Sequence, residues 1–143
     1  MPLQNFGSIL NFAEELESQD QQFYEAAAGN AACAAYQALF VQLAAEAAKN
    51  VKTVQRIRRE NVTEMILEPV RDFMRAPFCE TCEGAAVQPA AEVLAMARRL
   101  ESRAEHYYVE ASEKIRALTE VSRALKTLGK NRKARSAKLA SLG

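Results

Sequence analysis

The chain has 143 residues, of which 49% are hydrophobic, and a formal net charge of +1, which together predict one folded domain spanning residues 1–143. Five glycines and four prolines are few for a protein built of strands and turns, whereas the abundant alanine, leucine and glutamate favour helix. No apolar run reaches the ~18 residues that a membrane span needs, and the first ten residues do not resemble a signal peptide. We therefore expect an all-α protein of the cytoplasm.

Hydrophobic residues recur at helical spacing in four long segments, residues 8–28, 31–60, 90–116 and 119–142. Gly29 is a natural end for the first helix, and Asn30 can cap the second. Gly129 lies inside the fourth segment, where a glycine weakens a helix by about 1 kcal/mol.

A long connection, residues 61–88, separates the second helix from the third. Its first part, residues 61–77, has the pattern of a shorter amphipathic helix that Pro69 bends and Pro77 ends. A loop is predicted over residues 78–89.

Charges are distributed unevenly along the chain. Residues 1–46 contain six acidic side chains and no lysine or arginine, whereas seven basic and no acidic side chains follow Glu120. The two ends could attract each other within one chain or across a dimer. The basic fourth helix lacks interleaved aromatic residues and any DNA-binding motif, so we expect a solvated face or an acidic partner rather than nucleic acid.

The first and third helices contain the same motif. Leu16, Glu17 and Ser18 are followed by Tyr24, and Leu100, Glu101 and Ser102 are followed by Tyr108, at an ungapped offset of 84 residues. The second and fourth helices align at an offset of 85 residues, through hydrophobic positions alone. This internal repeat predicts two helical hairpins, joined by the crossover 61–88 into a four-helix bundle.

The stretch "FAEELESQDQQFY" resembles the first-helix motif of the rubrerythrin branch of the ferritin-like superfamily. The resemblance covers roughly residues 8–60 and 90–142 and implies a ferritin-like bundle. Members of that family hold two irons in the bundle core, with one Glu from each first helix and Glu-x-x-His from each second helix. The resemblance therefore implies that the carboxylates of Glu17 and Glu101 face the metal position.

The other four ligands of the family are replaced in this chain. Ala47 and Asn50 stand in the Glu and His positions of the second helix, and Arg132 and Arg135 in those of the fourth. The single histidine, His106, is five residues from Glu101 and so lies on a different side of that helix. We expect a surface or interface position for His106 and no di-iron centre.

Two apposed carboxylates inside a bundle repel each other unless a cation lies between them. We expect Arg132 or Arg135 to supply that cation, with Tyr24 and Tyr108 donating hydrogen bonds to the carboxylates. In the alternative arrangement the fourth helix is rotated and both arginines point to solvent.

The predicted loop contains Cys79 and Cys82, separated by two residues. They could form a dithiol redox pair, supply half of a zinc site that a second chain completes, or be incidental loop residues. The adjacent Glu80 and Glu83 would raise the thiol pKa values. Four aromatic side chains and the third cysteine are expected in the core, Tyr36, Phe40, Phe73, Phe78 and Cys33.

These observations favour a metal-depleted, non-catalytic rubrerythrin-like protein without a cofactor, acting through protein partners, first of all as a homodimer. One alternative is a rubrerythrin-like oxidoreductase whose iron or manganese site is rebuilt from Glu17, Glu101, and Glu105 or Glu46. Another is a thiol or zinc module centred on the two loop cysteines.

Overall fold

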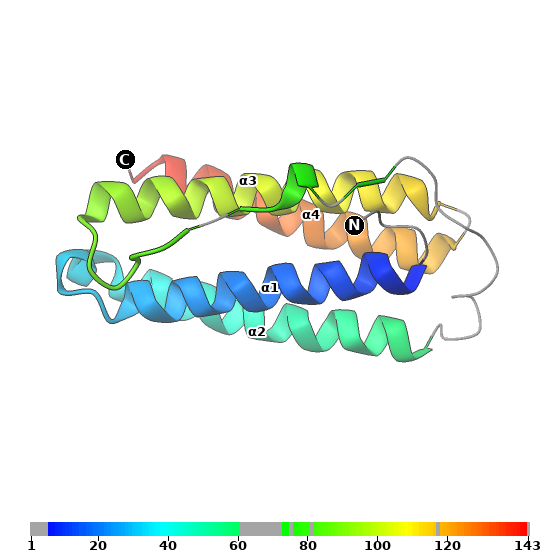
Figure 1. The fold of residues 1–143 in the computed structure, drawn as a ribbon, viewed down its shortest axis with the longest axis horizontal. Helices are drawn as coiled ribbons and strands as arrows, with labels where there is room; N and C mark the ends of the chain where they lie inside the picture. Colours follow the sequence, from blue (N-terminus) through cyan, green and yellow to red (C-terminus); the bar gives the residue numbers. More distant parts are fainter. Residues whose placement is uncertain (1–5, 61–72, 75, 81, 117, 143) are drawn as a thin grey trace.

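The computed structural model describes residues 6–60, 73–74, 76–80, 82–116 and 118–142. Over these residues, four long helices lie in two layers (Figure 1), which confirms the predicted all-α four-helix bundle. The helices are α1 (Phe6–Ala28), α2 (Gln37–Glu60), α3 (Ala90–Lys114) and α4 (Thr119–Ala140), with the short 3₁₀ helices η1 (Ala31–Tyr36) and η3 (Ala76–Phe78). None of the described helices is long and apolar enough to cross a membrane.

The bundle consists of two antiparallel hairpins, α1 with α2 and α3 with α4 (Figure 1). The described part of the crossover runs back along α3, so that α3 is antiparallel to α1 (Figure 1). Most of the amphipathic piece predicted over residues 61–77, including Pro69, lies outside the described residues.

The second helix differs from its prediction over its first six residues. Residues 31–36 form η1 rather than α-helix, because Cys33 has non-helical dihedral angles (φ −105°, ψ 19°). Asn30 caps this turn, since its side-chain oxygen accepts a hydrogen bond from the Ala32 N–H at 2.9 Å. The Asn30 amide also donates to the carbonyls of Ala85 and Gln88, at 2.9 and 2.8 Å, and so attaches the start of the second helix to the loop before α3.

The core has two apolar parts, one toward each end of the bundle. In one part, Phe73 and Phe78 of the crossover pack on Tyr107, with ring centroids 5.6 and 5.2 Å away, and the Tyr107 hydroxyl donates to the Ile9 carbonyl. The other part contains Tyr24, Phe40 and Cys33, with Tyr36 packed against it. The predicted core positions of these residues are therefore confirmed, with Tyr36 only partly buried.

Gly129 of α4 packs closely against α3. A Cβ atom on this residue would be 3.2 Å from the Cβ of Tyr108, which is tighter than ordinary packing. The glycine weakens α4 by about 1 kcal/mol in intrinsic propensity. Because it has no side chain, Gly129 allows α4 to lie close to α3. Arg132 follows one turn later on α4, and its side chain is buried in the core.

Candidate functional site

A layer of ionic side chains lies between the two apolar parts of the core, with Glu17 of α1 near its centre. One oxygen of Glu17 accepts hydrogen bonds from Asn50 Nδ2 at 3.2 Å and from Arg132 Nη2 at 2.5 Å. The other accepts from the Tyr108 hydroxyl at 2.5 Å. All four side chains are buried, so α2, α3 and α4 each contribute one polar partner to the same carboxylate of α1.

Arg132 joins the two carboxylates of the repeat. Its Nη1 pairs with Glu101 and its Nη2 with Glu17, and the residue is 0% exposed. Nη2 also lies 2.8 Å from Asp20 Oδ2, as an ion pair without the alignment of a hydrogen bond. The structure thus places Arg132 between the carboxylates, where the sequence led us to expect it or Arg135, and not in solvent.

Arg135 lies at the edge of this layer. Its side chain is 10% exposed, and its Nη1 is 3.6 Å from Glu101 Oε1. Its Nε is 3.1 Å from Glu46 of α2, a carboxylate that is itself partly exposed. Arg135 therefore links α4 to α2 and gives Glu101 a second cation.

Two members of the layer, Asp20 and Arg103, were not predicted from the sequence. Asp20 Oδ1 accepts from Arg103 Nη2 at 2.7 Å, and Arg103 Nη1 donates to the Phe78 carbonyl at 2.9 Å. Asp20 follows Glu17 by three residues and so shares its helix face, a signal that was available in the sequence. The position of Arg103 had no such signal, because one of its partners is a backbone carbonyl of the crossover.

The two tyrosines of the repeat have different surroundings. Tyr108 bonds to the carboxylate of the other hairpin, Glu17, rather than to Glu101 of its own helix. Within the described part of the chain, the Tyr24 hydroxyl has no hydrogen-bond partner, and its ring stacks on Phe40 with centroids 6.0 Å apart. Burial raises the pKa of both tyrosines, so both remain neutral at physiological pH.

Burial acts in opposite directions on the pKa values of Asp20 and Arg132. Burial raises the pKa of Asp20 to about 6, even though Arg132 and Arg103 oppose the shift. Burial also acts to lower the pKa of Arg132, but Glu17, Glu101 and Asp20 outweigh it, and the pKa lies above its ordinary value. The guanidinium is thus a permanent cation between the two repeat carboxylates.

The layer does not have the composition of a metal site. The positions at which the family resemblance predicts the other four ligands carry Ala47, Asn50, Arg132 and Arg135, none of which is a carboxylate or an imidazole. Among the described residues, no group of three or more His, Cys, Asp or Glu side chains could hold a metal ion. A buried guanidinium would repel an entering cation. The residues present therefore do not fit a metal pair.

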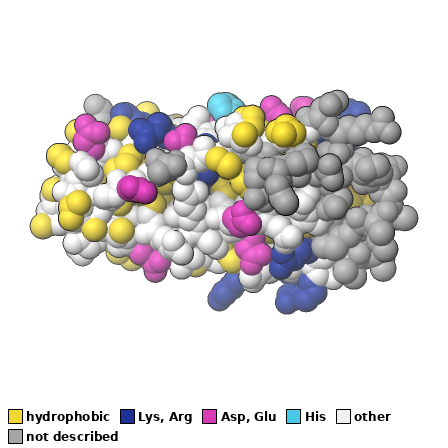
Figure 2. All heavy atoms as spheres, in the orientation of Figure 1, with side chains coloured by type: hydrophobic (Ala, Val, Ile, Leu, Met, Phe, Trp, Pro, Cys, Tyr) yellow, Lys and Arg dark blue, Asp and Glu magenta, His cyan; other side chains and the backbone are white. Residues whose placement is uncertain are grey.

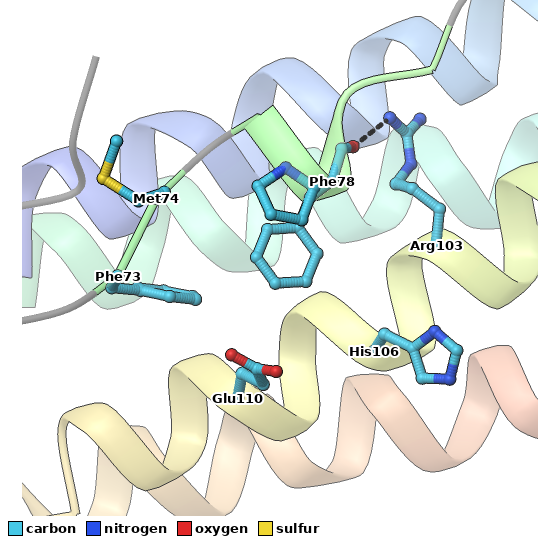
Figure 3. Close-up of a pocket in the computed structure, with 7 residues that line it drawn as sticks. Phe73, Met74, Phe78, Arg103, His106 and Glu110 are labelled. Carbon is cyan, nitrogen blue, oxygen red and sulfur yellow. Dashed lines mark hydrogen bonds between the residues drawn. The ribbon is translucent and has the colours of Figure 1, made fainter.

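The remaining sequence candidates lie outside the layer. His106 is exposed on α3, where it lines a pocket of about 360 Å³ with Phe73, Phe78 and Glu110 (Figure 3). Glu105 is half-buried on α3. The two loop cysteines are thiols, Cys79 exposed and Cys82 half-buried.

Comparison with known proteins gives one family match. A family model described as a ferritin-like domain matches residues 7–131, which include α1, α2, α3 and the first half of α4. No curated protein and no solved structure matches the chain.

Replacing the central cation is expected to destabilise the fold strongly. Arg132→Met would leave Glu17, Asp20 and Glu101 buried without their shared partner, and we expect a loss of about 3–5 kcal/mol in the free energy of unfolding at neutral pH. Urea denaturation measures this loss. Lys133→Met, one residue along on the exposed face, should change stability by less than about 0.5 kcal/mol. Equal effects of the two substitutions would contradict the buried position of Arg132.

The raised pKa of Asp20 predicts a pH dependence with a definite sign. Between its unfolded value of 3.8 and its folded value of about 6, the folded chain holds a proton that the unfolded chain has released, so stability falls as pH rises through this window. The amide side chain in the Asp20→Asn variant does not titrate in this range of pH. The difference in unfolding free energy, wild type minus Asp20→Asn, should therefore decrease by roughly 2–3 kcal/mol from pH 4 to pH 7. A constant or rising difference in urea titrations would show that burial does not raise this pKa.

Proposed function

Because the chain belongs to the family of ferritin-like domains, we propose that it is a metal-depleted, rubrerythrin-like member in which Arg132 takes over the charge role of the metal pair. The observation that carries the proposal is the fully buried guanidinium in contact with both repeat carboxylates. In a di-iron protein, metal cations offset the carboxylate charge. Here a side chain that remains protonated at physiological pH does so.

The same contacts support the proposal that the protein is not a catalyst. Iron chemistry in this family depends on carboxylates and imidazoles that surround two metals. In this chain Glu17 already accepts from Asn50, Tyr108 and Arg132, and Glu101 is paired with Arg132 and Arg135. Neither carboxylate can bind a metal without first losing buried ion pairs, which are costly to break.

The rebuilt oxidoreductase site receives less support. Its candidate additional ligand Glu46 is paired with Arg135 at the rim, so that a metal there would have to displace a guanidinium. Glu105 follows Glu101 by four residues, but Glu17, Glu101 and Glu105 together supply only three of the six ligands that hold a di-iron pair.

Metal analysis tests the proposal. Protein purified from iron- and manganese-supplemented cells, then incubated with Fe(II) without oxygen and desalted, should retain far less than the about two irons per chain of a di-iron protein. The matched control carries Ala47→Glu, Asn50→His, Arg132→Glu and Arg135→His, which restore both Glu-x-x-His motifs. This variant should retain iron under the same conditions. About two irons in the wild-type chain would overturn the proposal.

We further propose that the protein acts through protein partners, the first being a second copy of itself. Ala38, Val41 and Ala45 follow one another at helical spacing on α2, and all are exposed, with Val41 54% exposed. Figure 2 shows hydrophobic side chains gathered at the end of the molecule where η1 joins α1 and α2. Small side chains allow two helices to approach closely, which supports pairing through the face of α2 that carries Ala38, Val41 and Ala45.

Sedimentation measures the pairing. The wild-type chain should sediment as a dimer, and Val41→Lys should shift it toward the monomer by burying a charge in the interface. Val109→Lys is the matched control, because Val109 is 46% exposed on α3, and it should leave the dimer unchanged. A monomeric wild type, or equal effects of the two substitutions, would contradict this interface.

A further inference from the structure

The segment between η3 and α3 contains the two loop cysteines, Cys79 and Cys82. Cys79 is exposed and Cys82 half-buried, and both are thiols. Cysteines separated by two residues are close enough along the chain to close a disulfide, as in dithiol oxidoreductases. A reagent in solution can therefore reach the Cys79 thiol, and the half-buried Cys82 thiol follows it by three residues in the chain.

Arg99 of α3 is a charged neighbour of Cys82. Its Nη2 lies 3.7 Å from Cys82 Sγ, and its Nε lies 3.4 Å from Glu80 Oε1. Burial raises the pKa of Cys82, while Arg99 opposes the shift. Cys82 is therefore mostly a protonated thiol at neutral pH, with a guanidinium in place to stabilise the thiolate when the proton leaves. These surroundings suit a thiol that reacts second, after Cys79.

We propose that Cys79 and Cys82 form a reversible dithiol that small-molecule disulfides oxidise. The Cys79 thiolate attacks one sulfur of the external disulfide, so that a mixed disulfide forms and one external thiolate leaves. The Cys82 thiolate then attacks Cys79 Sγ, closing the internal disulfide and releasing the second external thiolate. The protein loses two protons and two electrons, and the external disulfide is reduced to two thiols.

The same segment is attached to the ionic layer by two backbone carbonyls. The Phe78 carbonyl accepts from Arg103, which also holds Asp20, and the Glu80 carbonyl accepts from Gln19 Nε2 of α1 at 2.7 Å. A disulfide between residues 79 and 82 restricts the backbone angles of Glu80, which lies inside the closed ring. Oxidation therefore disturbs the bond to Gln19, and the effect reaches α1 next to Asp20.

Intact-mass measurement with oxidised glutathione tests the proposal. All variants carry Cys33→Ser, so that only the loop thiols remain. The background protein, reduced beforehand and treated with chelator, should lose the mass of two hydrogens, and a dithiol reductant should reverse the change. Adding Cys82→Ser should trap one glutathione on Cys79. Adding Cys79→Ser should give slower modification, because Cys82 is less accessible.

Two results would overturn the proposal. One is a background protein that stays reduced or accumulates two glutathiones, since either shows that the ring does not close. The other is faster modification of Cys82 than of Cys79. The urea midpoint of the oxidised background protein should differ from that of the reduced protein, and identical midpoints would overturn the link to α1. None of these outcomes bears on the metal content of the bundle, which depends on other residues.

Discussion

The contact of one guanidinium with two buried carboxylates is the constraint on which the rest of the bundle depends. Arg132 pairs with Glu17 of the first hairpin and Glu101 of the second. It therefore holds the two hairpins together and also neutralises the charge of the two carboxylates. Burying such a group is costly unless every partner is in place. The close approach of α4 at Gly129, the amide of Asn50 and the hydroxyl of Tyr108 can all be understood as conditions for that contact.

Around Arg132 the two hairpins contribute unequally. Glu17 is surrounded by an amide, a phenol and a guanidinium, whereas Glu101 is paired with two guanidinium groups. A metal pair would require similar ligands from both halves, and an arginine cluster does not. The loss of symmetry is therefore what one expects once a side chain from a single helix provides the cation.

Much of this arrangement could be predicted from the sequence, for identifiable reasons. The helices follow from hydrophobic spacing, and aligning the repeats led to the expectation that Arg132 or Arg135 lies between the carboxylates. The change to 3₁₀ geometry over residues 31–36 could not be predicted, because it depends on the dihedral angles of Cys33 and on contacts of Asn30 with a distant loop. Arg103 was missed for a similar reason, since the Phe78 carbonyl that it binds has no side-chain signature. The symmetric expectation for Tyr24 was also too simple, because only Tyr108 has a carboxylate partner in the described structure.

The contacts that join the hairpins at either end of the bundle make the two halves of the chain different from each other. Asn30 binds the loop before α3, and Tyr107 binds the backbone of α1 at Ile9. At the offset of 84 residues, the counterpart of Asn30 is Lys114 and that of Tyr107 is Phe23. Lys114 has no side-chain oxygen to accept the backbone N–H that Asn30 accepts, and Phe23 has no hydroxyl to donate. Each contact exists once, so the two halves are no longer interchangeable. A chain with two copies of either hairpin would lack one of these contacts.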